Sequence, residues 1–155
     1  MTVHMIWAEA RDRVIGAGGR IPWRIPGEQA IFKERTMGAT VVMGRGTWDS
    51  LPRKPLPGRQ NVVLTRDRAW SAPGAAVIHE VDEVPLDPDV WIMGGESVYA
   101  AFLPQAGHIV RTRIDLEVSG DTRAPELGPE WVVTESAGRT TPDGVRYVVE
   151  ELIRS

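Results

Sequence analysis

The chain has 155 residues, the usual size of one domain, and no cysteine, which excludes disulfides and cysteine-based metal sites. Its net charge of −3 argues against a nucleic-acid or membrane surface, since either would need a basic excess. The three histidines, His4, His79 and His108, lie far apart and show no metal-ligand spacing, so we expect no bound metal.

The beginning of the chain reads as a buried strand and not as a targeting signal. Val3–Ala8 is apolar, with no basic segment before it and no small-residue cleavage site after it. No apolar run approaches the roughly 20 residues that a membrane span needs. We therefore expect a cytoplasmic protein that does not contact membranes.

Apolar runs of strand length recur along the chain. Several are continuous and do not alternate with polar residues, which is typical of strands covered on both faces. The expected strands are Val3–Ala8, Thr40–Met43, Asn61–Leu64, Ala75–Ile78, Val90–Met93, Ile109–Ile114, Trp131–Glu135 and Val145–Leu152.

Stretches with helical character lie between some of these strands. Pro26 suits the first position of a helix and Pro104 suits the end of one. The expected helices are Pro26–Arg35, Gly46–Leu51 and Ser97–Leu103.

The alternation of strands and helices predicts an α/β fold with a mostly parallel central sheet of about eight strands and about four flanking helices. The sequence Pro-Asp-Gly in Thr141–Gly144 predicts a turn, and so a C-terminal antiparallel hairpin at the sheet edge. We expect one domain over residues 1–155. Monomer is the default, because no heptad repeat or plainly exposed apolar stripe is present.

The pattern of a strand, a glycine turn and a helix start occurs twice, in Thr40–Trp48 and in Val90–Tyr99. Glycine lets the backbone approach a ligand closely, and the start of a helix offers unpaired N–H groups to phosphate. Each turn alone is explained equally well as an ordinary tight turn, and neither matches the Rossmann or P-loop pattern. Together, and with Arg45 on the first turn, they favour binding of a dinucleotide.

Thr65 and Arg66 follow the strand Asn61–Leu64. With Arg45 they could grip a phosphate on the adenosine ribose, which would favour NADPH over NADH. The alternative for Arg66 is a solvated charge at the end of a strand.

Glu28 lies on the same face of its expected helix as Ile31 and Phe32, because residues three and four apart are neighbours. A carboxylate on an apolar face must find a partner or become protonated. It could accept two hydrogen bonds from the adjacent ring N–H and amino groups of a pteridine. The alternative is a surface glutamate that complements the helix dipole, and helical spacing does not decide between the two.

Short motifs stand in a distinctive order: Arg13–Gly16, Ile21–Trp23, Glu28–Lys33, Val42–Arg45 with Thr47 and Trp48, Leu56–Asn61, Met93–Gly95 with Tyr99, and Gly120–Thr122. In this order they resemble the dihydrofolate reductases of the bacterial chromosomal kind, over nearly the whole chain. The resemblance implies NADPH-dependent reduction of 7,8-dihydrofolate to tetrahydrofolate, with hydride transfer to C6 and protonation of N5.

Two alternatives remain. One is a reductase of the same fold that acts on another pteridine or on a riboflavin-pathway pyrimidine. The other is a non-catalytic nucleotide-binding module.

The resemblance implies a folate site in which Glu28 anchors the pteridine, Thr112 supports Glu28 by a hydrogen bond, and Trp23 borders the ligand. Arg59 looks like the group that binds the α-carboxylate of the glutamate tail, and Phe32 contacts the benzoyl part. The expected folate contacts are Ile6, Ala8, Glu28, Gln29, Phe32, Lys33, Leu51, Leu56, Arg59, Met93 and Thr112.

The resemblance also implies an NADPH site, with a cis peptide between Gly94 and Gly95. The expected contacts are Trp7, Ala8, Ile15, Gly16, Ile21, Gly44, Arg45, Gly46, Thr47, Leu64, Thr65, Arg66, Met93, Gly94, Gly95, Glu96, Ser97, Val98, Tyr99 and Thr122.

Gly16–Trp23 resembles the mobile loop that closes over the nicotinamide, and Asp121 looks like its partner in the closed state. Three positions depart from the family. Glu28 stands where most bacterial members carry Asp, Gln29 stands where the family is usually apolar, and Glu96 replaces the third glycine of the second turn.

Overall fold

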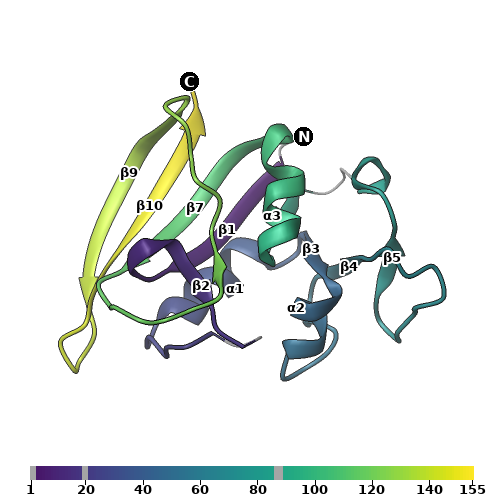
Figure 1. Ribbon diagram of the computed structural model, residues 1–155, viewed down its shortest axis with the longest axis horizontal. Helices are drawn as coiled ribbons and strands as arrows, with labels where there is room; N and C mark the ends of the chain where they lie inside the picture. Colours follow the sequence, from purple (N-terminus) through teal and green to yellow (C-terminus); the bar gives the residue numbers. More distant parts are fainter. Residues whose placement is uncertain (1–2, 19–20, 86–88) are drawn as a thin grey trace.

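The computed structural model describes residues 3–18, 21–85 and 89–155, and its largest element is a twisted sheet of eight strands (Figure 1). The strand order is β5-β4-β3-β6-β1-β7-β10-β9. The strands are β1 (Val3–Glu9), β3 (Thr40–Gly44), β4 (Gln60–Leu64), β5 (Ala76–Ile78), β6 (Val90–Ile92), β7 (Ala106–Ile114), β9 (Trp131–Thr140) and β10 (Arg146–Arg154).

The six strands from β5 to β7 pair in parallel, whereas β10 pairs antiparallel with both β7 and β9. The predicted mostly parallel sheet with a C-terminal antiparallel hairpin is therefore confirmed. The hairpin forms one edge of the sheet, with β9 outermost (Figure 1).

Three α-helices and three short 3-10 helices occur in the described ranges, against the expected four or so. They are α1 (Glu28–Thr36), α2 (Arg45–Ser50), α3 (Glu96–Phe102), η1 (Arg11–Arg13), η2 (Val81–Glu83) and η3 (Leu103–Gln105). The expected start of α1 at Pro26 is wrong. Gly27 takes the N-cap position with a φ of 90°, a left-handed conformation that suits glycine and keeps Pro26 outside the helix. None of the helices among the described residues is long and apolar enough to cross a membrane.

A second, two-stranded antiparallel sheet was not expected from the sequence. It consists of β2 (Val14–Gly16) and β8 (Thr122–Arg123), and we call it the β2–β8 ribbon. Both strands are too short to show an apolar pattern. The ribbon lies close to the end of β1, at the same end of the sheet as the start of α1 (Figure 1).

Apolar side chains cover both faces of the sheet, because alternate residues of its inner strands point to opposite sides. On one face, Met5 and Ile92 pack with Phe102 of α3. On the other face, Ile6 and Val63 pack with Phe32 of α1 and Trp48 of α2.

The helices α2 and α3 follow the neighbouring strands β3 and β6 but lie on opposite faces. A crevice forms where connections leave neighbouring parallel strands in opposite directions, and in open α/β sheets this is where ligands bind. The fold therefore places a binding site at the carboxyl ends of β3 and β6.

At the hairpin, Glu151 of β10 contacts basic side chains from two other elements. Arg35 of α1 donates to both of its carboxylate oxygens, at 3.0 and 2.8 Å, and His108 Nε2 lies 3.0 Å from Oε1. These bonds, the arginine's foremost, lower the pKa of Glu151 to about 2.

Glu151→Gln is expected to remove part of the acid sensitivity of the fold. Because the pKa of Glu151 is lower in the folded chain than in the unfolded one, its stabilising effect is complete above about pH 5 and is lost as the pH falls toward about 2. Urea unfolding at about pH 7 should show the variant less stable by about 1–2 kcal/mol. The difference should shrink at about pH 3.

Glu117→Gln is the control, since this exposed carboxylate lies 3.9 Å from Arg11 at a solvated surface. A difference for Glu151→Gln that stays constant from pH 7 to pH 3 would contradict the prediction.

Candidate active site

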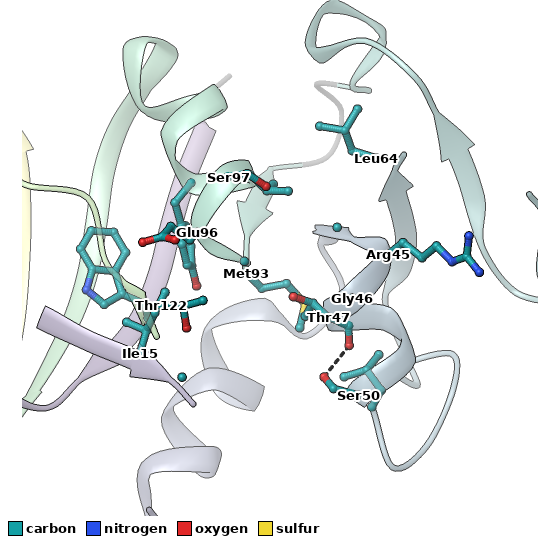
Figure 2. A pocket seen from close by; sticks show the side chains of 18 of the residues that line it. Ile15, Arg45, Gly46, Thr47, Ser50, Leu64, Met93, Glu96, Ser97 and Thr122 are labelled. Carbon is teal, nitrogen blue, oxygen red and sulfur yellow. Dashed lines mark hydrogen bonds between the residues drawn. The ribbon is translucent and has the colours of Figure 1, made fainter. Parts of the chain in front are cut away.

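A cleft of about 1690 Å³ opens at the carboxyl ends of the parallel strands. Its walls come from the ends of β1, β3, β4 and β6 and from all three α-helices. In Figure 2, Ile15, Glu96 and Thr122 lie on one side of the cleft and Arg45 and Leu64 on the other. Its lining extends from residues of α1, such as Glu28 and Phe32, to residues that follow β4 and β5, such as Arg66 and His79.

Every residue that the sequence predicted for the two ligand sites lines this cleft, with the exception of Thr112. Thr112 is buried in β7, where it pairs with Ala8 and Val149 in the neighbouring strands. Among the described residues, the hydroxyl group of Thr112 makes no direct hydrogen bond to Glu28. Its support of Glu28 stays a prediction.

Glu28 is the first residue of α1, and its side chain reaches the cleft. Its helical neighbours Ile31 and Phe32 pack in apolar clusters beside it, as the spacing predicted. Burial raises the pKa of Glu28 above its ordinary value. A partly desolvated carboxylate gains from any ligand that brings N–H donors to it.

Tyr99 of α3 is buried and lines the cleft. Its hydroxyl group donates a hydrogen bond to the carbonyl oxygen of Ile6 at 2.8 Å, and its ring packs against Trp7 with centroids 5.3 Å apart. Burial, and after it the charge of Glu28, raises the pKa of Tyr99, so the phenol remains a neutral donor. This bond fixes the middle of β1 against α3.

The two glycine turns contact each other directly. The N–H of Gly44 donates to the carbonyl oxygen of Gly94 at 2.8 Å, and the Gly94–Gly95 peptide is cis, as predicted. A β-carbon on Gly44 would lie 3.1 Å from Cγ2 of Val98, and one on Gly95 would lie 3.7 Å from Oγ1 of Thr47. The absence of side chains therefore leaves backbone and hydroxyl groups open to the cleft, a donor set that suits a pyrophosphate.

The basic residues predicted for the adenosine end lie together beyond the first turn. Arg45 pairs with Asp67 at 3.5 Å and with Asp49 at 3.8 Å, and its guanidinium lies 5.7 Å from the centre of the Trp70 ring. Arg66 is exposed and lines the same end of the cleft.

The contact predicted between Asp121 and the loop that follows β2 is present. The N–H of Gly18 donates to Oδ2 of Asp121 at 2.9 Å. Ile21 and Trp23, farther along the loop, line the cleft. The loop residues Gly19 and Arg20 lie outside the described residues.

Some cleft residues were missed. They are Asp49, Ser50, Pro52, His79, Glu80, Val81 and Ala101. His79 could have been found, because it follows β5 as Thr65 follows β4, and the carboxyl ends of parallel strands meet at one edge. The two residues are in contact, with His79 Nδ1 2.8 Å from the carbonyl oxygen of Thr65.

Comparison with known proteins agrees with this geometry. A family model described as dihydrofolate reductase matches residues 2–154. The chain belongs to the dihydrofolate reductase family. The sequence-based resemblance is thereby confirmed.

Individual members of the family resemble the chain over nearly its full length. The dihydrofolate reductase of Mycobacterium tuberculosis (strain H37Rv) is 46% identical over 158 residues, covering 99% of this chain and 98% of that protein. The dihydrofolate reductase of Neisseria gonorrhoeae is 40% identical over 154 residues, covering 95% and 94%. The solved structure of the dihydrofolate reductase of Enterococcus faecalis, complexed with NADP(H) and RAB-propyl, superposes with a TM-score of 0.91 at 30% identity, covering 99% and 96%.

Proposed function

We propose that this chain reduces 7,8-dihydrofolate to 5,6,7,8-tetrahydrofolate, with NADPH as the reductant. The observation that carries the proposal is one cleft that joins a partly desolvated carboxylate, Glu28, to the paired turns at Gly44 and Gly94. The first suits the donor edge of a pteridine and the second suits a dinucleotide. Family membership and the NADP(H) complex of the Enterococcus faecalis protein support the same assignment.

Residues at the α1 end of the cleft bind the substrate. Glu28 accepts hydrogen bonds from the ring N–H and the 2-amino group of the pteridine. Phe32 and Leu51 supply apolar walls, and Arg59 binds the carboxylate of the glutamate tail. Gln29 makes this part of the wall more polar than is usual in the family.

Residues at the other end hold the cofactor. The turns at Gly44 and Gly94–Gly95, with the hydroxyl groups of Thr47 and Ser97, would hold its pyrophosphate. Arg45 and Arg66 would bind a 2′-phosphate, which would select NADPH over NADH. NADPH, when bound, supplies the hydride.

The protein contributes position and electrostatics to the hydride transfer. Glu28 binds the edge of the pteridine remote from N5, so it does not deliver the proton itself. Its negative charge stabilises the ring as N5 gains a proton, and a water molecule near the loop after β2 delivers that proton. Trp23 and Ile21 limit the access of other water to the site.

We also propose that residues 1–155 form one domain that acts as a monomer in the cytoplasm and does not bind nucleic acid. All the longer strands join one sheet, and the net charge of −3 supports the last point.

The decisive experiment mixes the purified protein with NADPH and dihydrofolate and follows the loss of the NADPH absorbance. We expect turnover with dihydrofolate and much slower turnover with NADH. Turnover with a riboflavin-pathway pyrimidine or another pteridine, but not with dihydrofolate, would assign the substrate to the rival reductase. Binding of NADPH without any loss of absorbance would indicate a nucleotide-binding module.

A further inference from the structure

Glu96 occupies the first position of α3, directly after the turn at Gly94–Gly95. Its side chain lines the cleft, and its Oε2 accepts a hydrogen bond from the backbone N–H of Arg123 at 2.9 Å. Figure 2 shows Glu96 on the same side of the cleft as Thr122 and Ile15 of the β2–β8 ribbon. One side chain therefore joins the second glycine turn to the ribbon, and a glycine at this position would leave the bond unmade.

The segment Asp121–Arg123 is bound to the start of the loop as well. The N–H of Asp121 donates to the carbonyl oxygen of Gly16 at 3.0 Å, and its Oδ2 accepts from the N–H of Gly18 at 2.9 Å. Thr122 pairs with Gly16 in the ribbon. Three consecutive residues thus contact Glu96 on one side and Gly16–Gly18 on the other.

The ribbon is a short element whose position depends on few bonds. β8 has two residues. Beyond its pairing with β2 it is held by Arg123 Nε, which donates to the carbonyl oxygen of Asp12 at 3.2 Å, and by bonds between Arg13 and Ala124, in which the N–H of Ala124 donates to the carbonyl oxygen of Arg13 at 2.8 Å and the Arg13 guanidinium donates to the carbonyl oxygen of Ala124. Val14 and Gly16 of β2 are buried, but the two residues of β8 are half-buried or exposed, and short segments with little buried surface open at little cost in free energy. The segment before β8 also approaches β2 closely, because a β-carbon on Gly120 would lie 2.5 Å from the carbonyl oxygen of Gly16. A single added hydrogen bond therefore has a measurable effect on where β2 lies.

The position of β2 matters for the reaction because Ile15 and Gly16 line the cleft beside the second glycine turn. We propose that Glu96 is a positioning residue, which couples the turn at Gly94–Gly95 to Gly16–Gly18 through the segment Asp121–Arg123. This inference rests on the proposed function only where it concerns hydride transfer. The coupling itself belongs to the ligand-free protein.

The hydrogen bond of Glu96 and its negative charge act on different properties, the position of the ribbon and the binding of the cofactor, and substitutions can separate them. The bond holds the ribbon at the edge of the cleft, whereas the negative charge opposes a polyanionic cofactor in the same cleft. Glu96→Gln keeps an acceptor oxygen and removes the charge. Glu96→Ala removes both. Glu126→Ala is the control for loss of a negative charge near the ribbon, because Glu126 is exposed three residues beyond Arg123 and is not among the residues that line the cleft.

The first measurement is amide hydrogen exchange in the ligand-free protein. In Glu96→Ala, the N–H groups of Arg123 and Gly18 should exchange about fivefold faster, the effect of one exposed hydrogen bond. In Glu96→Gln and Glu126→Ala, they should exchange within about twofold of the unaltered protein.

The second measurement is single-turnover hydride transfer from NADPH to dihydrofolate. Glu96→Ala should be slower by about fivefold with an unchanged KM for dihydrofolate, because the loss is one of position and not of substrate binding. Glu96→Gln, which keeps an acceptor oxygen, should recover most of the rate that Glu96→Ala loses, and it should bind NADPH more tightly, since a negative charge has been removed.

Unchanged exchange at Gly18 in Glu96→Ala would overturn the proposal. So would a Glu96→Gln variant that behaves like Glu96→Ala, since the charge would then be responsible. Faster exchange throughout the sheet in Glu96→Ala would also overturn it, by showing general destabilisation. Failure of the unaltered protein to oxidise NADPH would refute the proposed function instead, and the exchange measurement would still decide on the coupling.

Discussion

Replacing Glu28 by glutamine is expected to slow hydride transfer from NADPH to dihydrofolate at neutral pH by about 10²–10³-fold, a loss of about 3–4 kcal/mol of transition-state stabilisation. The amide keeps the size of the side chain, but it has no negative charge to stabilise a ring that gains a proton at N5. It also presents a donor where the pteridine has donors of its own. Because Glu28 lies beside Ile31 and Phe32 in a partly desolvated site, water compensates little for the lost charge.

The measurement is the single-turnover rate at saturating NADPH and dihydrofolate, with Glu28→Asp as the matched variant. Aspartate keeps the carboxylate and shortens the side chain by one methylene, so its rate should stay within about tenfold of the unaltered protein. An unchanged rate in Glu28→Gln would show that the carboxylate does not act in the reaction. Equal losses of rate in the two variants would show that the rate depends on the exact position of the side-chain end and not on its charge.

Arg59→Ala is expected to raise the KM for dihydrofolate by about 10–100-fold and to change kcat by less than about threefold, because a contact to the remote tail binds substrate and transition state alike. Hydrogen bonds within the protein orient this guanidinium. Its Nε donates to the carbonyl oxygen of Pro57 at 3.0 Å and its Nη1 to Oγ1 of Thr36 at 3.1 Å. Its carbon lies 5.7 Å from the centre of the Phe32 ring, and burial lowers the pKa of Arg59.

A second substrate supplies the control for Arg59. A dihydropterin without the aminobenzoyl-glutamate tail should be reduced by Arg59→Ala as well as by the unaltered protein. Arg59→Lys, which keeps the charge but cannot form the two parallel hydrogen bonds, should give an intermediate KM for dihydrofolate. If Arg59→Ala impairs reduction of the tail-less substrate as much as reduction of dihydrofolate, then Arg59 supports Phe32 and the pocket wall and does not bind the tail.

The inner strands of the main sheet could be predicted because they carry buried apolar runs, which periodicity detects. Prediction was weakest where burial gives no signal. The strand expected over Trp131–Glu135 extends to Thr140, and every residue of β9 after Trp131 is exposed. The β2–β8 ribbon is likewise held by backbone bonds between residues about 110 positions apart, which no local pattern encodes.

In the candidate site, too, some residues could be predicted from local motifs, whereas others depend on how distant elements pack. Residues that belong to ordered motifs, such as Glu28 and Gly44, were placed in the cleft as predicted. Thr112 was expected to support Glu28 by a hydrogen bond, but the two residues lie in different elements, β7 and α1, and their relative position is not encoded in a local pattern. The bond between Glu96 and Arg123 depends on where the ribbon packs and became visible only in the fold.

The hydrogen bond from Gly44 to Gly94 has a consequence for affinity. These glycines are far apart in the chain, yet the sheet register that pairs Val42 with Ile92 brings their turns into contact before any ligand arrives. The spacing between the two turns is thus preorganised, and a cofactor that bridges them need not spend binding energy on ordering flexible loops. Substitutions in β3 or β6 that shift this register would therefore weaken cofactor binding without touching a cofactor atom.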